Sequence, residues 1–424
     1  MNSNGIFVSL DIGTSTVKMI IGEMSNDALN IIGVGNVKSE GLKKGSIVDI
    51  DHTVQSIRRA VEQAERMVGM EIRKVIVGIP CHHISLIDCH GVVAVSGENR
   101  EITNEDVLRV IDAAQVISIP PEREIINVIQ KQFIVDSRTD IHDPRGMIGV
   151  RLEMEGLLVT GSKTVLLNIL RSVEKAGLEI VDIVLQPLAS GEIAISQDEK
   201  NLGSVLVDIG GGSTSISYFE DGYLQGTSLL PIGGDNITKD LSIVLRTTTE
   251  AAEQIKVKYG HAFYELASAD VQFSYPVIGS NQQQQTTQMD IAEIIEARLE
   301  ETFFLVQDEL RKMGVKDVPG GYVLTGGTAN IDGILELAQS VFQNRVRIAI
   351  PDYIGVREPQ YTTAVGIIKY AYKSAKMQGK LLTDSVLPME SKEKRTAKSH
   401  ARAKENVSPS FSARMKQFFG SFFE

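Results

Sequence analysis

The sequence predicts an α/β protein with two related lobes, a small inserted α+β domain and a C-terminal amphipathic helix on a disordered linker. Segments with strand-like and helix-like patterns alternate along most of the 424 residues, a length that suits more than one domain core. A strand–turn–strand pattern near the N-terminus recurs 197 residues later. The chain then ends in a Phe-rich segment that follows a highly charged stretch.

Composition limits the possible functions. A formal net charge of −11 argues against a general nucleic-acid binder, so we expect no nucleic-acid partner. Residues 384–424 differ from the rest because they hold eight Lys and Arg against five Asp and Glu. No run approaches 18 apolar residues, so we expect no membrane-spanning segment. Two cysteines without a secretory signal favour a reducing cytoplasm.

The first lobe opens with three strands and a helix, and another strand follows. The strands are expected over 5–13, 15–24, 28–39 and 73–80, and the helix over 48–70. Residues 82–159 then read as a separate domain, with a strand, a helix opened by an N-cap pair of Thr103 and Asp106, and two more strands. Cys81, Cys89 and nearby His residues raise zinc as an alternative, but the alternation there is typical of a strand and no second ligand pair follows.

The second half repeats this alternation of strands and helices. We expect helix–strand–helix over 162–195, strand–turn–strand over 203–224, and a helical stretch over 236–260. The Gln run at 282–285 is predicted to be a loop tip. A long amphipathic helix over 291–314, a strand–turn–helix unit over 320–342 and a closing helix over 361–377 complete the body.

Three glycine-containing turns are the candidate ligand-binding segments. In the two repeats, Asp11 and Asp208 end a strand and are followed by the first Gly turn (residues 13–16) and the second Gly turn (residues 210–214). Glycine lets successive backbone N–H groups point at phosphate oxygens, and a carboxylate suits hydrated Mg²⁺. One such loop alone could be an ordinary hairpin. A third Gly turn, within 324–333, follows a strand and opens a helix, and the three together predict a nucleotide-phosphate site closed from two sides.

These three segments resemble the phosphate 1, phosphate 2 and adenosine motifs of the actin, Hsp70 and sugar-kinase superfamily. Segments 185–195 and 362–370 resemble its two connecting helices. Over essentially the whole chain, the resemblance is greatest to the FtsA family of actin-like bacterial cell-division proteins. It implies an actin-like two-lobed ATPase fold with these parts: 1–81 and 160–203 as subdomain 1A, 82–159 as the inserted 1C domain, 204–236 and 311–358 as 2A, 237–310 as 2B, 359–383 as the closing helix of 1A, 384–409 as the disordered linker, and 410–424 as the terminal helix.

The resemblance also implies ATP and Mg²⁺ as cofactors, with Mg²⁺ held by Asp11 and Asp208 through water. Gln186 would orient the attacking water, although a buried structural Gln is the alternative, and no evident strong base favours more than slow ATPase activity. Glu253 and Lys256 would contact ribose and adenine, or else form a solvated i, i+3 pair. The full nucleotide-binding set is Gly13, Thr14, Ser15, Thr16, Lys18, Gly210, Gly211, Gly212, Ser213, Thr214, Gly233, Gly234, Glu253, Lys256, Gly326, Gly327 and Ala329.

The C-terminal segment has a different character. Residues 384–409 are too polar to offset chain entropy and are expected to be disordered. At helical spacing, the Phe side chains beyond them gather on one face with a cationic rim, which predicts a helix lying in a membrane interface. Docking on the body, or in a groove of another protein, are the alternatives. The predicted membrane set is Phe411, Arg414, Met415, Lys416, Phe418, Phe419, Phe422 and Phe423.

The predicted function is an ATP-binding actin-like protein that polymerises at the inner face of the cytoplasmic membrane, anchors the tubulin-like FtsZ and helps assemble the division septum. The resemblance implies that the FtsZ C-terminal peptide binds residues 237–310, where Arg298 matches a basic position of the family; a helix-surface Arg paired with Glu301 is the alternative. Further expected partners are other copies of the chain, anionic lipids, and division proteins at the inserted domain. Another actin-like scaffold of the rod-shape or pilus-assembly type, or an Hsp70-like or sugar-kinase-like ATPase, are the rival functions.

Overall fold

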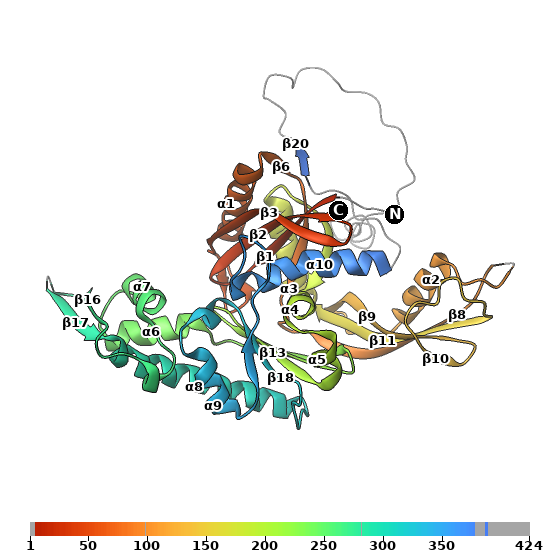
Figure 1. Cartoon of the computed structure of the whole chain (residues 1–424). Helices are drawn as coiled ribbons and strands as arrows, with labels where there is room; N and C mark the ends of the chain where they lie inside the picture. Colours follow the sequence, from red (N-terminus) through yellow and green to blue (C-terminus); the bar gives the residue numbers. More distant parts are fainter. Residues whose placement is uncertain (1–4, 98, 281, 378–385, 389–424) are drawn as a thin grey trace, which may run out of the picture.

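The computed structural model describes residues 5–97, 99–280, 282–377 and 386–388. At its centre lie two five-stranded sheets with helices packed between them (Figure 1). The sheet of the first lobe has the order β3-β2-β1-β7-β12, and that of the second lobe the order β15-β14-β13-β18-β19. Their strands are β1 (Gly5–Ile12), β2 (Thr16–Ser25), β3 (Ala28–Lys38), β7 (Lys74–Ile79) and β12 (Glu179–Leu185); and β13 (Ser204–Ile209), β14 (Thr214–Glu220), β15 (Tyr223–Leu230), β18 (Gly321–Thr325) and β19 (Val346–Ile348).

The two sheets share one topology. Each consists of three antiparallel strands in sequence order, joined on one side by two parallel strands. The predicted internal repeat is therefore confirmed, and it extends from two turns to two complete sheets. Parallel strands of this kind need helical crossovers, so helices cover the faces of both sheets.

Helices on both faces explain why β1 is almost uniformly apolar. Val8 and Leu10 belong to a core on one face, beneath α1 (Ile50–Val68) and α3 (Lys163–Lys175). Phe7 faces the opposite way, into a core shared with α4 (Gln186–Ala194) and α10 (Thr362–Met377). A strand buried on both faces has no solvent-exposed face, which is why apolar residues point to both sides of β1 and its two polar residues, Ser9 and Asp11, are themselves buried.

Helices α4 and α10 form the connection between the lobes, and they cross in backbone contact. A Cβ placed on Gly366 of α10 would lie 2.0 Å from the carbonyl oxygen of Ala189 on α4. Only glycine permits this approach. Such a close crossing fixes the positions of α4 and α10 relative to each other.

The inserted domain has a four-stranded antiparallel sheet of order β10-β9-β11-β8 with α2 packed on one face. A reciprocal hydrogen-bond pair of Thr103 and Asp106 opens α2, which confirms the predicted N-cap. Three strands, rather than the predicted two, follow the helix, because a short hairpin return separates the long strands. The elements are β8 (Ser85–Ala94), α2 (Asn104–Ala114), β9 (Arg123–Val135), β10 (Arg138–Ile141) and β11 (Arg151–Ser162).

The second lobe carries the subdomain that corresponds to the predicted residues 237–310. The stretch 236–260 is two helices rather than one, because Arg246 adopts a left-handed φ of 52° and Thr248 caps the second helix. The prediction of a loop tip for the Gln run is also wrong: three of its residues lie in β17, paired with β16, whose Phe273 and Tyr275 are buried. The elements of this subdomain are α6 (Gly234–Val244), α7 (Thr249–Tyr259), η1 (Tyr264–Leu266), β16 (Gln272–Pro276), β17 (Gln283–Thr287) and α8 (Gln288–Lys312). Outside it lie α5 (Gln197–Leu202), η2 (Gly327–Asn330), α9 (Ile334–Phe342) and η3 (Pro359–Tyr361).

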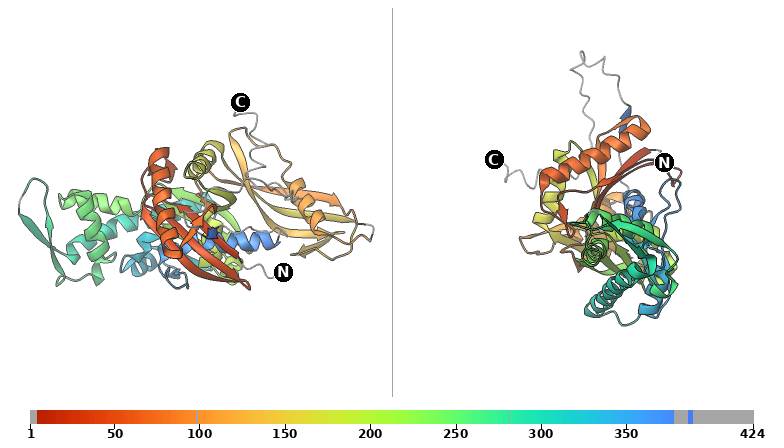
Figure 2. Two further views of the ribbon diagram at one scale, coloured as in Figure 1. Left: turned by 90° about the horizontal axis from the view of Figure 1, so that it is seen from above. Right: turned by 90° about the vertical axis from the view of Figure 1, so that its left-hand side faces the viewer.

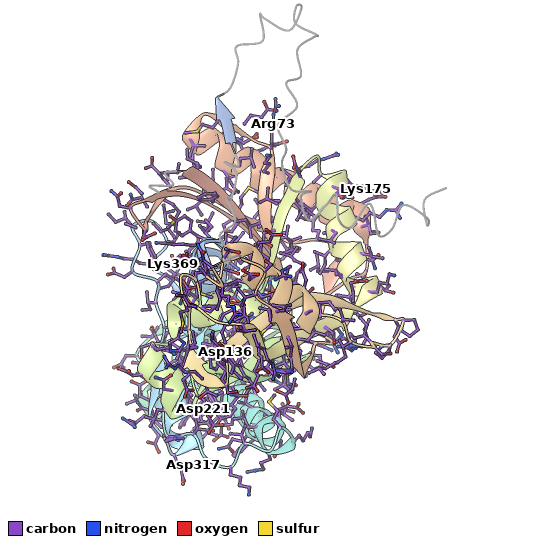
Figure 3. All side chains as sticks on the ribbon, turned by 90° about the vertical axis from the view of Figure 1, so that its right-hand side faces the viewer. Arg73, Asp136, Lys175, Asp221, Asp317 and Lys369 are labelled. Carbon is purple, nitrogen blue, oxygen red and sulfur yellow. The ribbon has the colours of Figure 1, made fainter. Side chains whose placement is uncertain are left out.

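The molecule is elongated, with the inserted domain at one end and the β16–β17 hairpin at the other (Figure 2). Charged side chains cover the outside, and Arg73 and Asp317 mark opposite ends of the body in a perpendicular view (Figure 3). Two small antiparallel pairings complete the first lobe: the hairpin of β4 (Leu42–Lys43) and β5 (Ser46–Ile47), and the pairing of β6 (Met70–Ile72) with β20 (Val386–Pro388), which is distant in the sequence.

Strand β20 lies within the segment predicted to be disordered, so that prediction is wrong for residues 386–388. The remainder of 384–409, and the predicted membrane helix over 410–424, lie outside the described residues. Within the described ranges, no helix combines the length and apolarity needed to cross a bilayer.

Candidate nucleotide-binding site

The first and second Gly turns are built in the same way. In each, an Asp lies near the end of the strand, and the turn closes with one backbone hydrogen bond: Gly13 N to Thr16 O and Gly210 N to Ser213 O, both 3.0 Å. Pairing of β1 with β2 and of β13 with β14 continues up to these turns, so both are fixed by their sheets. The carboxyl ends of the two central strands therefore carry two matched loops.

The two Asp side chains have different neighbours. Asp11 forms an ion pair with Lys18 at 3.7 Å and accepts a 2.7 Å hydrogen bond from the Gln186 amide. Burial raises the pKa of Asp11 even though Lys18 and Gln186 oppose the shift. Asp208 instead accepts a 3.0 Å hydrogen bond from the Thr363 hydroxyl.

The carboxylates of Asp11 and Asp208 also act on each other. Burial raises the pKa of Asp208, and the negative charge of Asp11 raises it further. The two carboxylates repel each other, and Lys18 is the one ammonium beside them in the described part of the chain, so a bound cation would be favourable at this position.

The first and second Gly turns contact each other. The Ser15 hydroxyl donates to Asp235 at the start of α6, 3.2 Å away. A Cβ on Gly211 would lie 1.8 Å from Ser15 Oγ, and one on Gly212 would lie 2.4 Å from Thr14 Cγ2. The glycines of the second turn are therefore required by the closeness of the first turn. Thr214 differs from the prediction, because its buried hydroxyl donates to the Ile232 carbonyl and so holds the turn.

The third Gly turn packs against the second. Thr328 donates to the Gly210 carbonyl at 3.0 Å, and Gly326 has a φ of 91° with its Cβ position 2.4 Å from Asp208 Oδ1. Gly233 approaches the Gly210 carbonyl so closely that its Cβ position would lie 2.5 Å from that oxygen. Ala329 is buried and Gly327 is exposed, which leaves the backbone of the third turn open to a ligand.

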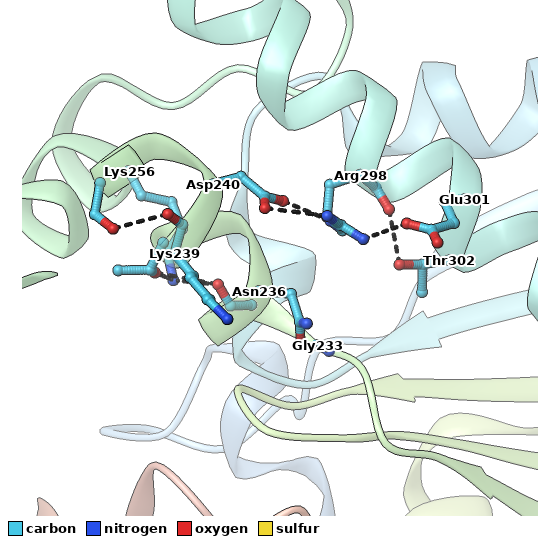
Figure 4. Close-up of polar contacts among 11 residues, drawn as sticks. Gly233, Asn236, Lys239, Asp240, Lys256, Arg298, Glu301 and Thr302 are labelled. Atoms are coloured by element: carbon cyan, nitrogen blue, oxygen red, sulfur yellow. Dashed lines mark hydrogen bonds and ion pairs between the residues drawn. The ribbon is translucent and has the colours of Figure 1, made fainter. Parts of the chain in front are cut away.

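Lys256 lies beside the start of α6 (Figure 4), and Glu253 is its ion-pair partner. The Lys256 ammonium donates to the Gly234 carbonyl at 3.0 Å and to Thr238 at 2.8 Å, and pairs with Glu253 at 2.7 Å. Because Lys256 is only 8% exposed, the pair is not the solvated one considered as an alternative. Lys256 instead supports the loop around Gly234.

The sequence pattern did not single out Thr363, Asp235, Thr238 or Thr328, which complete the site. Each is a small polar residue of a common type, and even Thr328, which lies within the third Gly turn, has no feature that marks its side chain as part of the site. Asp235 and Thr238 follow Gly234 directly, and the positions at the starts of helices, where polar groups meet loops, are the one signal that could have identified them.

The donor set fits a magnesium ion that keeps most of its water. Asp11 and Asp208 supply carboxylate oxygens, whereas no cluster of three or more His, Cys, Asp or Glu side chains occurs in the part of the chain that the structure describes. Cys81 and Cys89 are both buried, and burial raises the pKa of the Cys81 thiol to about 12. The cysteines are therefore core residues.

Arg298 joins α8 to α6 (Figure 4). Its guanidinium donates to both Asp240 carboxylate oxygens, at 2.5 and 3.0 Å, and also contacts Glu301. The i, i+3 pair with Glu301 predicted as an alternative is therefore present, together with an interhelix pair that the sequence did not indicate. The hydrogen bonds that Arg298 donates to Asp240 hold the pKa of Arg298 above its usual value.

Repeated sheets, two facing Gly turns and crossing connecting helices define an actin-like nucleotide-binding fold. Structure comparison agrees: the chain matches a PilM–PilN type IV pilus biogenesis complex with a TM-score of 0.59 and 16% identity, covering 86% of this chain and 98% of that one. It also matches ADP-bound MreB5 of Spiroplasma citri, with a TM-score of 0.54 and 14% identity over 88% and 98% of the two chains.

The particular family follows from sequence. The family model described as cell division protein FtsA matches residues 205–366, and the model for the SHS2 domain inserted in FtsA matches residues 81–160. Cell division protein FtsA of Bacillus subtilis (strain 168) is 61% identical over 380 residues, which cover 90% of this chain and 86% of that protein. The chain belongs to the FtsA family of cell division proteins.

Proposed function

We propose that this protein binds MgATP in the cleft between its lobes, polymerises on the inner face of the cytoplasmic membrane, and anchors FtsZ there during septum assembly. Membership of the FtsA family supports the role in division. The observation that carries the nucleotide part is the pair of matched Gly turns, which face each other beside Asp11 and Asp208.

In this proposal the backbone N–H groups and hydroxyls of the first and second Gly turns hold the phosphates. Mg²⁺, held through water by Asp11 and Asp208, would neutralise charge on the phosphate oxygens. The third Gly turn and the region of Glu253 and Lys256 receive the adenosine. Gln186 is fixed by Asp11 at the edge of this space, where it can orient water. No described side chain in contact with it is a strong base, so any hydrolysis is slow.

Isothermal titration of the purified protein tests the nucleotide proposal. MgATP is expected to bind, and EDTA is expected to weaken binding because the two carboxylates then face the phosphates without a cation between them. A titration with no heat and no change in melting temperature on adding MgATP would contradict the proposal.

For the FtsZ peptide, the proposed site is the surface of α6 and α8 around Arg298. An acidic peptide would have to displace Glu301, whose side chain is half exposed, while the buried-side pair with Asp240 remains. Arg298→Glu should weaken binding of an FtsZ tail peptide at least tenfold, measured by fluorescence anisotropy. Arg311→Glu is the matched control, because Arg311 lies on the same helix and has an i, i+3 acidic partner. Equal affinities for both variants would remove Arg298 from the site.

For the membrane, the proposed anchor is the Phe-faced segment 410–424. Its apolar face supplies burial and its cations favour anionic headgroups. One segment should bind modestly, whereas many on one polymer should bind tightly through effective concentration. The full chain should float with vesicles that contain anionic lipid, and a chain ending at residue 409 should not. Flotation of the shortened chain would place the anchor elsewhere.

Assembly is tested by sedimentation with and without MgATP, on vesicles and in solution. We expect more polymer when both nucleotide and anionic vesicles are present, since each favours the same assembled state. The inserted domain is the proposed contact for other division proteins. Deleting 82–159 should abolish their capture and leave MgATP binding intact.

A further inference from the structure

One short hairpin beside the candidate site has no assigned role. Strands β4 and β5 pair Leu42 with Ile47 and Lys43 with Ser46, joined by a two-residue turn of Lys44 and Gly45. Both turn residues have positive φ, 51° and 78°, as a type I′ hairpin turn requires. We call residues 42–47 the lysine hairpin.

The lysine hairpin is anchored at its base. The Gly41 carbonyl accepts from the backbone N–H groups of Val48 and Asp49, at 2.8 and 3.0 Å. Asp49 then caps α1 by accepting from His52 N. Leu42 and Ile47 pack against the core of the first lobe. These contacts fix the direction in which the tip projects.

The tip reaches both phosphate-facing turns. Gly45 N donates to Thr14 Oγ1 in the first Gly turn at 3.0 Å. A Cβ on Gly45 would lie 3.8 Å from Ser213 Oγ in the second Gly turn, which belongs to the other lobe. These contacts are with the two phosphate-facing turns, so the tip stands at the phosphate end of the cleft. A cavity of about 40 Å³ behind Gly45 gives the tip room to adjust.

The charges at this end of the cleft do not balance. Asp11, Asp208 and Asp235 contribute three carboxylates, and Lys18, already paired with Asp11, contributes one ammonium. Lys256 is occupied by Glu253 and two oxygen acceptors. MgATP is itself a net anion, and charge on its terminal phosphate needs cationic partners. Mg²⁺ therefore leaves an excess of negative charge.

Lys43 and Lys44 are the cations available at the tip. Both are exposed, and neither has a salt-bridge partner among the residues that the structure describes. We propose that Lys43 and Lys44 bind the terminal phosphate of the nucleotide and make the cleft select ATP over ADP. This inference rests on the proposed nucleotide function and adds to it a specificity element outside the three Gly turns.

The test compares MgATP and MgADP affinities by isothermal titration in the full chain and in a Lys43→Gln/Lys44→Asn variant. Asn followed by Gly is the sequence that a type I′ turn favours, so this variant removes both charges without straining the hairpin. We expect the MgATP Kd to rise about tenfold and the MgADP Kd to change less than about threefold, since only ATP has the third phosphate.

Lys316→Gln is the matched control. Lys316 is exposed and lies just before Gly320, which pairs with Gly203 at the opposite ends of β13 and β18 from the site. The control should bind both nucleotides as the unchanged chain does.

The outcomes separate the two proposals. If the unchanged chain binds no nucleotide, the proposed function fails. If it binds MgATP but the double variant binds both nucleotides with unchanged affinity, or loses both equally, the role of the lysine hairpin is overturned. Unchanged affinities with a loss of sedimentable polymer would also overturn it, and would place these lysines at a contact between copies.

Discussion

The first and second Gly turns are alike in backbone and different in the partners of their Asp residues. Both end the first strand of a three-stranded meander, and both close with the same 3.0 Å backbone hydrogen bond. Asp11, however, has a cation and an amide as neighbours, whereas Asp208 has one hydroxyl and the charge of Asp11. The repeated fold thus supplies the geometry twice but neutralises only one of the two carboxylates.

This asymmetry assigns different roles to the two lobes. Asp11 is part of the stable structure of the first lobe, because Lys18 is buried with it. Asp208 accepts its hydrogen bond from a neutral hydroxyl, and the charge of Lys18 acts on it only from a distance. We therefore expect ligand binding to affect the second lobe more than the first. Helix α10 connects the two lobes, because its Thr363 donates to Asp208.

The largest expected effect comes from neutralising each Asp in the nucleotide-free protein. Asp11→Asn leaves the Lys18 ammonium, 11% exposed, without its carboxylate and should lower the free energy of unfolding by about 3 kcal/mol. Asp208→Asn removes a buried charge that forms no ion pair among the residues that the structure describes, and it keeps an acceptor for Thr363, so the free energy of unfolding should stay equal or rise. Urea unfolding without nucleotide measures both. Equal losses in the two variants would mean that the carboxylates are equivalent after all.

Much of this site could be predicted from the sequence, because turns that need a positive φ or a close backbone approach require glycine, and glycines can be seen directly in the sequence. The repeated Asp–Gly pattern identified both turns, and their equal closure by a hydrogen bond confirms the local geometry. The separate block at 82–159 was predicted from its pattern of strands and helices, whereas the two connecting helices were predicted from the resemblance to the actin-like superfamily. The two-strand pairing of the Gln run was missed because its apolar support comes from Phe273 and Tyr275, on the partner strand.

Partners that come from distant segments could not be predicted. Thr363 is 155 residues from Asp208, and Asp240 is 58 residues from Arg298, so only the folded chain brings them together. A single Thr within a helix looks the same whether its hydroxyl faces a carboxylate or a neighbouring carbonyl. The sequence therefore predicts which turns form the site but not which side chains fix its charges.

Removal of the Thr363 hydroxyl sharpens the comparison at the second turn. Thr363→Val deletes the hydrogen bond to Asp208, together with a 3.2 Å hydrogen bond between the Thr363 and Ser190 hydroxyls, and should raise the MgATP Kd five- to tenfold, the effect of losing about 1–1.4 kcal/mol. Thr362→Val is the control, since Thr362 is buried next to it but contacts Thr325. Both variants should lose similar stability. Rescue of affinity by Thr363→Ser would confirm the hydroxyl, and a similar loss in Thr362→Val would reject it.

The Asp208 carboxylate should also make the stability of the protein depend on pH. Burial and the charge of Asp11 raise the pKa of Asp208, so the folded state favours its protonated form. Its contribution to stability is complete below the ordinary pKa of Asp, about 4, and is lost as pH rises through the raised pKa. The stability gain of Asp208→Asn over the unchanged chain should therefore grow from pH 4 to pH 7. A difference independent of pH across this range would contradict the raised pKa.

The smallest expected effect concerns the hydrogen bond between Ser15 in the first Gly turn and Asp235 at the start of α6. Ser15 donates to Asp235 at 3.2 Å in an exposed position, where water can replace it, so Ser15→Ala should change the free energy of unfolding by no more than about 0.5 kcal/mol. The matched change in the other turn, Thr214→Val, removes a buried donor from the Ile232 carbonyl and should cost about 1–2 kcal/mol. If Ser15→Ala cost as much as Thr214→Val in urea unfolding, the contact between the lobes would be a structural brace. The expected small value instead leaves the Ser15 hydroxyl free to exchange Asp235 for a phosphate oxygen.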